Sequence, residues 1–84
     1  MNTENTHYEE FHVDGEGLIA KIKEILHEGN VRRIIIKDEK GNTYIEIPLT
    51  VGIVGVILLP VWAAIGAIAA LAANFTIVVE RADL

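Results

Sequence analysis

Hydrophobic residues are distributed unevenly along the chain. The longest run without a charged side chain extends from Leu49 to Phe75, LTVGIVGVILLPVWAAIGAIAALAANF. An apolar run of about 18 or more residues is a candidate transmembrane helix. Its second half is rich in alanine and glycine, which allow helices to approach closely in lipid or in a protein core. The pattern predicts one long apolar helical segment over 49–75, kinked at Pro60 because proline has no amide donor.

A shorter amphipathic helix is expected before this run. Asp14 is a suitable N-cap, because its carboxylate can accept hydrogen bonds from the free amides of a first helical turn. Gly29-Asn30 is a typical helix stop. Between these points, apolar residues recur at helical spacing on one stripe: Leu18, Ile22, Ile25 and Leu26.

Three short segments have the composition of β-strands. Arg32–Lys37 and Thr43–Pro48 are rich in β-branched residues and flank the turn sequence DEKGN, in which Gly41 suits a positive φ. Thr76–Arg81 follows the long apolar run, and Asn74 is a plausible stop for the helix before it. A long helix that folds back would allow Thr76–Arg81 to join the hairpin, whereas a helix that crosses a bilayer would leave it without a strand to pair with.

The alternation of side chains predicts how such a sheet would bury its residues. One face would be apolar and covered by both helices: Ile34, Ile36, Ile45, Ile47, Ile77 and Val79. The other would carry mostly polar residues and cross-strand charge pairs: Arg33, Ile35, Lys37, Tyr44, Glu46 and Glu80. The predicted fold is α+β, a small α-β-β-α-β module with a three-stranded mixed sheet, in which the third strand lies beside the first and parallel to it. Residues 1–10 are expected to be a flexible polar N-terminus, and residues 11–84 a single domain.

The long segment is apolar nearly all round, so packing on one sheet would leave one side uncovered. Small residues recur along it at spacings that suit close helix–helix contact. The expected contact positions, toward other copies or toward lipid, are Gly52, Gly55, Leu58, Trp62, Gly66 and Ala70. Two hypotheses follow. In the first, the chain is a structural protein that packs this helix against other copies in a homo-oligomer or filament. In the alternative, the same helix associates with a membrane or anchors the protein in a bilayer.

Composition and motifs argue against several other classes of function. The chain has 84 residues, a net charge of −5 and no cysteine, which predicts one domain without disulfides and argues against a broad nucleic-acid surface. The polar N-terminus does not resemble a secretory signal, which favours a cytoplasmic or membrane-associated location. The His and Glu residues of His7–His12 match no metal motif, and Gly15 and Gly17 match no phosphate loop. We therefore expect no enzyme activity, cofactor, metal or small-molecule substrate.

The order of several blocks resembles a known family. GNVRRIIIKD, IEIPLTVGIVG, PVWAAIGAIAALAANF and TIVVER occur in this order, as in the short prokaryotic proteins grouped as domain of unknown function 4342. The resemblance covers the chain from about Glu9 onward. It implies a compact module with one apolar helix, and it implies no catalytic or binding residue.

Overall fold

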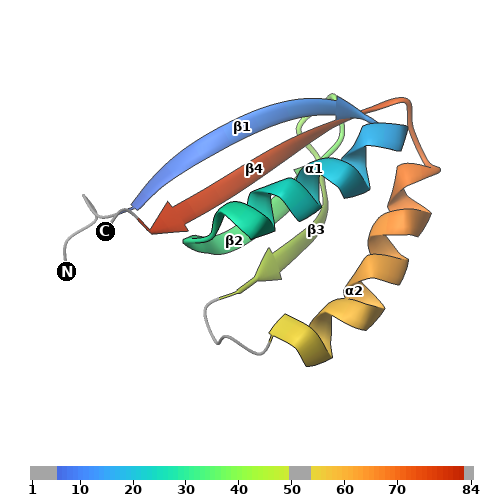
Figure 1. Cartoon of the computed structure of the whole chain (residues 1–84). Coiled ribbons are helices and arrows are strands. Elements are labelled where there is room, and N and C mark those ends of the chain that lie inside the picture. Colours follow the sequence, from blue (N-terminus) through green and yellow to red (C-terminus); the bar gives the residue numbers. More distant parts are fainter. Residues whose placement is uncertain (1–5, 50–53, 83–84) are drawn as a thin grey trace.

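The computed structural model describes residues 6–49 and 54–82, and within the second helix it describes side chains from Val61 onward. Six elements follow one another along the chain: β1 (Thr6–Asp14), α1 (Gly15–Glu28), β2 (Val31–Lys37), β3 (Thr43–Pro48), α2 (Val54–Ala69) and β4 (Asn74–Ala82). The four strands form one sheet, and Figure 1 shows both helices in front of it. The molecule is thus a two-layer α+β structure with one open sheet face.

The sheet differs from the predicted three-stranded mixed sheet. Its strand order is β1-β4-β2-β3, and every neighbouring pair is antiparallel. The neighbours β3, β2 and β4 lie in the predicted order, but the predicted parallel direction of β4 relative to β2 is wrong. The crossover through α2 makes β4 parallel to β3, and the hairpin makes β3 antiparallel to β2, so β4 must run against β2. Each helix therefore connects two parallel strands that have a third strand inserted between them, the split βαβ arrangement.

Strand β1 is the element that the sequence analysis missed. Residues 6–10, assigned to a flexible terminus, form its first half, and the strand pairs with β4 from Thr6↔Ala82 to Asp14↔Asn74. Its alternation is hard to see because Glu9 stands on the helix side of the sheet, where an apolar residue is usual. The addition of β1 makes β4 a central strand rather than an edge.

Helix α1 forms as predicted. Its N-cap is Asp14, whose Oδ1 accepts a hydrogen bond from the amide of Gly17 at 2.7 Å. The helix ends at Gly29, with a φ of 86° and an amide that donates to the Leu26 carbonyl, and Asn30 follows with a φ of 59°. Its predicted apolar stripe faces the sheet, with Leu18, Ile22 and Ile25 buried. Both ends of this helix are therefore closed by residues next to it in sequence.

The β2–β3 hairpin also forms, with one correction. Its turn is closed by the Asp38 carboxylate, which accepts from the amides of Lys40 and Asn42, and Gly41 has the expected positive φ of 92°. The register shifts after Ile36, and the ring of Tyr44 lies 5.7 Å from the buried ring of Phe75. The prediction that Tyr44 lies on the polar face is therefore wrong, because the register irregularity changes the alternation at that point.

Helix α2 is shorter than predicted. It spans 16 residues, continues through Pro60 and ends at Ala69, whereas the prediction extended the helix to Phe75. Asn74 and Phe75 belong to β4 instead, and Phe75 is buried in the core. The amides of Ala70 and Leu71 donate to carbonyls three residues back, which tightens the last turn. Alanine alone would favour continuing the helix, so the termination arises from tertiary packing.

The core lies between the sheet and the helices. Its strand residues are those predicted, with Ile45 at the margin, and in addition Phe75, which the prediction had placed in the helix. Ile65 and Ile68 of α2 complete the core together with the α1 stripe. The buried side chains of β4 alternate along the strand, which is typical of a sheet with one covered face: Phe75, Ile77, Val79 and Arg81. The last of these is a charged residue, and its partners are described below.

Candidate functional site

The expected contact residues of the apolar segment fall in three regions. Gly52 lies outside the described residues. Gly55 and Leu58 belong to the first turns of α2, where only the backbone is described. Trp62 is half-buried, while Gly66 and Ala70 are exposed. Gly66 and Ala70 of the predicted contact set are thus accessible, whereas Trp62 is partly covered by the domain itself.

Helix α2 has two distinct faces in its described half. Ile65 and Ile68 are buried, and small uncharged residues occupy the opposite side at helical spacing: Ala63, Gly66, Ala67 and Ala70. Among the described residues, a methyl group added at Gly66 would find no atom within 4 Å apart from its chain neighbours and the nearby backbone of its own helix. We call these four residues the small-residue face of α2. It is uncharged and open, and it would allow another backbone to approach closely.

Trp62 packs against the domain itself. Its ring contacts the hydrophobic core, and the Nζ of Lys23, on α1, lies 5.7 Å from the ring centroid. This is within the distance at which a cation and an aromatic face attract each other. Trp62 therefore joins the two helices, with part of its surface still available to a partner.

The end of α2 meets the start of α1 in a very close contact. A methyl group added at Gly15 would lie 2.6 Å from the carbonyl oxygen of Ala69. A shallow hollow beside this contact is lined mainly by small residues, including Gly66, Ala70 and Ala73. Leu71, in the turn after the helix, is 66% exposed. The small-residue face thus continues to the end of the domain where the two helices meet.

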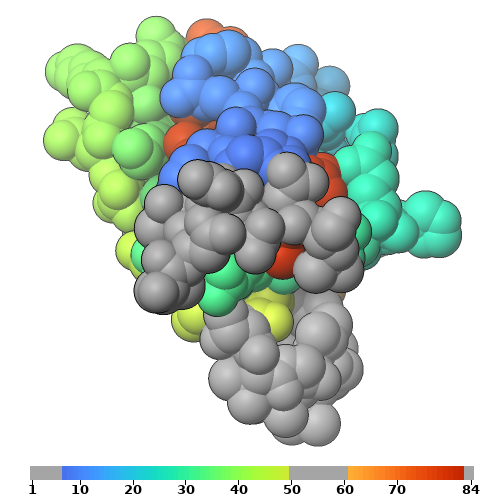
Figure 2. All heavy atoms as spheres, turned by 90° about the vertical axis from the view of Figure 1, so that its left-hand side faces the viewer, coloured from blue at the N-terminus to red at the C-terminus, as the bar shows by residue number. Residues whose placement is uncertain are grey.

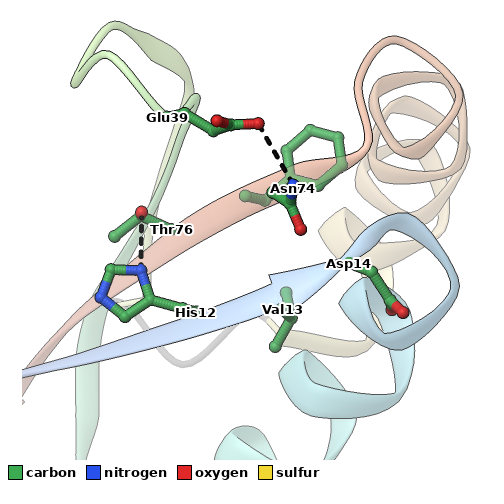
Figure 3. Close-up of a pocket in the computed structure, with 7 residues that line it drawn as sticks. His12, Val13, Asp14, Glu39, Asn74 and Thr76 are labelled. Carbon is green, nitrogen blue, oxygen red and sulfur yellow. Dashed lines mark hydrogen bonds between the residues drawn. The ribbon is translucent and has the colours of Figure 1, made fainter.

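A second, polar hollow lies where β1 and β4 approach the hairpin turn (Figure 3). His12 Nδ1 is 3.2 Å from Thr76 Oγ1, and the side-chain Nδ2 of Asn74 donates to Glu39 Oε2 at 3.2 Å. In Figure 3 the side chain of Asp14 points away from this group toward α1. A hydroxyl next to an imidazole can act as a nucleophile–base pair. Here the His12 side chain is 74% exposed, so water competes for the same hydrogen bond.

The open face of the sheet carries the charge pairs that the sequence predicted. Arg33 contacts Glu46 at 2.9 Å and Glu80 at 3.4 Å, joining three neighbouring strands. Ile35 lies beside them, paired with Glu46 and Val78. The Arg33–Glu46 pair is exposed and contributes little to stability, whereas the Glu80 side chain is only 14% exposed.

Arg81 forms a buried network that the sequence analysis did not find. Its guanidinium donates to Glu9 and Glu28, each at 2.6 Å, and to the Gly29 carbonyl at 2.9 Å. The hydrogen bond from Arg81 is the main cause that holds the pKa of the Glu9 carboxyl below its usual value. The same bond, from the other side, raises the pKa of Arg81. The network joins β1, the end of α1 and β4, and its sequence signals are the charged residues Glu9 and Arg81 at core-facing positions of their strands.

Within residues 6–49 and 54–82, no group of three or more His, Asp or Glu side chains could hold a metal ion. None of the helices in the described part combines the length and apolarity needed to cross a membrane.

Comparison with known proteins gives one match. The family model described as domain of unknown function (DUF4342) matches residues 4–81. The chain belongs to this family. The match includes β1 as well as the blocks that first suggested the resemblance. No curated protein and no solved structure matches the chain.

Proposed function

We propose that this DUF4342 protein is a non-enzymatic structural module that assembles with other copies of itself through α2. The observation that carries the proposal is the small-residue face of α2, which is exposed and uncharged although it belongs to the most apolar segment of the chain. Small residues let two helices approach closely, so that backbone and side-chain atoms make many van der Waals contacts.

A structural role is also supported by the surroundings of the polar groups. The buried charged side chain, Arg81, is held by two carboxylates and a carbonyl group. His12 and Thr76 lie on an open part of the sheet and contact each other across neighbouring strands. These contacts have a sufficient explanation in the stability of the fold, and the proposal assigns them no substrate.

The substitution Gly66→Leu tests the proposal. In the isolated domain a Cβ at this exposed position has open space among the described residues, so we expect the substitution to leave folding intact. At a close helix–helix contact it would overfill the site, at a cost of about 1–3 kcal/mol per copy. We expect sedimentation velocity in detergent-free buffer to show a defined assembly for the parent and its loss in Gly66→Leu, with unchanged circular dichroism.

A matched control adds the same side chain to the other helix. Ala20 is exposed on α1, and Ala20→Leu should leave the assembly intact. A parent protein that sediments as a monomer at all concentrations would refute the proposal. An unchanged assembly in Gly66→Leu, together with stronger binding to lipid vesicles, would instead favour the membrane-associated alternative, because added apolar surface favours lipid.

A further inference from the structure

The two edges of the sheet are built differently. Edge strand β3 has six residues and ends at Pro48, which has no amide to donate, and its pairing with β2 contains a register shift. These are common devices that prevent an edge from pairing with another chain. Edge strand β1 has nine residues, contains no proline and pairs with β4 in one continuous register. In Figure 1 it forms the outer border of the sheet. Among the described strands, only β4 pairs with it.

We propose that β1 is a second interface between copies of this chain, at which two β1 strands pair antiparallel about a twofold axis through Phe11. The axis would be perpendicular to the sheet, so that the two sheets join edge to edge and the helices of both copies stay on one side. Such a symmetric contact places residue i of one copy against residue j of the other, and residue j against residue i. With Phe11 on the axis, Glu10 of each copy faces His12 of the other.

Charge explains why this register is preferred. A twofold axis perpendicular to an antiparallel pair passes between two directly opposed residues. Each symmetric register therefore places one residue of β1 opposite the same residue of the other copy. Centring the axis on Glu10 or on Glu9 would bring identical carboxylates together, and like charges opposite each other are destabilising. Centring it on His12 would place Glu10 against Asp14. A pairing centred on Tyr8 brings no like charges together, but it joins only residues 6–10, whereas the pairing centred on Phe11 joins residues 8–14.

The carboxylates at the middle of β1 are the main objection to edge pairing, because charges on an edge usually prevent it. Both have suitable surroundings in the proposed register. Glu10 faces an imidazole, which can donate a hydrogen bond to it, and within one copy these two side chains already lie 3.7 Å apart. Glu9 lies on the helix side, where Arg81 holds its carboxylate at 2.6 Å, and it would face the apolar side chain of Val13.

Atoms of β1 reach the surface of the molecule. Figure 2 shows the β1 residues, in blue, on the surface between the hairpin turn and α1. Phe11 is half-buried and would meet its own copy on the axis, with Lys21 Nζ 4.3 Å from the ring centroid. An aromatic pair across two strands adds to the stability of a sheet. This interface is separate from the small-residue face of α2, so it does not depend on the proposed function. A chain with both contacts would link its copies in series.

The absence of cysteine from the chain permits a direct test. Prepare Glu10→Cys and His12→Cys as two separate proteins, mix them and oxidise mildly. Directly opposed residues of antiparallel strands have Cα atoms about 4.5–5.5 Å apart, which is within the range of about 4.4–6.8 Å that a disulfide spans. The proposed register predicts rapid disulfide formation between the two variants and at least tenfold slower crosslinking of either variant alone. In the mixed pair, one of the two Glu10–His12 contacts is still intact.

Controls separate the possible outcomes. Glu24→Cys, on the exposed side of α1, reports random collisions and should crosslink slowly with either variant. Rapid crosslinking of Glu10→Cys with itself would show the register centred on Glu10 and overturn the proposal. Mixed crosslinking no faster than that of Glu24→Cys would show an unpaired edge and also overturn it. Repeating the mixture in a Gly66→Leu background should give the same rate, so that the failure of one interface is seen independently of the other.

A charge exchange provides a second test that keeps both side-chain types. His12→Glu should weaken the association by about tenfold or more, because two carboxylates would then face each other across the interface at two places. The double variant Glu10→His/His12→Glu restores opposite partners and should recover the parent association constant. If the double variant assembles no better than the single one, the proposed register is wrong.

Discussion

The two helices of this protein are held in place by different means. Both ends of α1 are closed by groups next to it in sequence, the Asp14 carboxylate at the start and the Gly29 amide at the end. The distant Arg81 guanidinium adds a hydrogen bond to the Gly29 carbonyl. Helix α2 carries no charged residue, and its last turn lies against the backbone of Gly15. The limits of α1 can therefore be read from neighbouring residues, whereas the end of α2 depends on a contact with a distant part of the chain.

This difference has a consequence for function. The outward side of α1 carries charged residues such as Lys23 and Glu24, which are well solvated. The outward side of α2 presents the small-residue face. Burial of this face would remove no charged side chain from water. Of the two helices, α2 is the one that can exchange water for another protein surface at low cost. Three substitutions test whether the two helices are held in place in these different ways.

The largest effect is expected at the end of α1. Arg81→Met retains the apolar part of the side chain but removes the donors to Glu9, Glu28 and Gly29. Hydrogen bonds to charged groups contribute about 1.5–3 kcal/mol each. Because the two glutamates are partly exposed and regain water, we expect a total loss of about 1.5–3 kcal/mol in the free energy of unfolding, measured by urea denaturation. The control Arg33→Met, on the open face, removes one exposed pair and one pair with a largely covered carboxylate, and it should lose less stability than Arg81→Met.

The same variant predicts a change in acid sensitivity. In the parent, Arg81 lowers the pKa of Glu9 from its usual 4.5. A carboxyl whose pKa is lowered by folding contributes stability above its ordinary pKa and loses it as the pH falls through the lowered value. The parent should therefore lose stability steadily below pH 4.5, and Arg81→Met should lose less over the same interval. The Asp38 carboxyl, whose pKa is lowered mainly by the Asn42 amide, is common to both proteins and cancels in the comparison. Parallel stability curves would show that Arg81 does not interact with Glu9 in solution.

The junction between the helices gives the next largest effect. Gly15→Ala would be neutral or favourable for an isolated helix, since alanine has the higher propensity by up to about 1 kcal/mol. In the folded domain the new methyl group would lie 2.6 Å from the Ala69 carbonyl oxygen, a backbone atom that cannot rotate away. We expect a net loss of about 1–3 kcal/mol, seen as a lower thermal midpoint. Gly66→Ala, which adds the same group in open space, should not destabilise the fold. Equal midpoints for the two variants would show that α2 does not end against Gly15.

The sequence predicted the features that neighbouring residues determine, and it did not predict those that depend on contacts between distant parts of the chain. The caps and stripe of α1, the Gly41 turn and the apolar face of the sheet were predicted, because each depends on residues close together in the chain or on simple alternation. The end of α2 was not, because Ala70, Ala72 and Ala73 are good helix formers and only packing stops the helix. Gly66 and Ala70 of the small-residue face belonged to the predicted contact set, whereas Ala63 and Ala67 did not, and which of these residues are exposed required the fold.

Strand β1 shows a second reason for failure. Its sequence THYEEFHVD contains several β-forming residues, yet Glu9 interrupts the apolar alternation that usually identifies a strand with one buried face. The compensating charge is Arg81, which lies 72 positions away in the chain. Two charged residues that each appear misplaced in their own strand explain each other only once β1 and β4 are adjacent. A polar residue at a core-facing position in two separate segments is thus a signal that the segments pair.

The smallest of the three effects concerns the start of α1. Asp14→Ala removes the acceptor for the Gly17 amide, which should cost about 0.5–2 kcal/mol in the free energy of unfolding. Asp14→Ser retains an oxygen that can accept the same bond, so it should recover most of this loss, although it cannot restore the favourable charge near the helix N-terminus. Because Asp14 also ends β1, the two variants should be compared by hydrogen exchange as well. Exchange that is faster in the first turn of α1, but unchanged in β4, would place the effect in the cap. If Asp14→Ala instead accelerates exchange at the end of α2, then the start of α1 and the end of α2 are coupled through Gly15. In that case the start of α1 would depend on packing as the end of α2 does, and the difference between the two helices would not hold at this end of the domain.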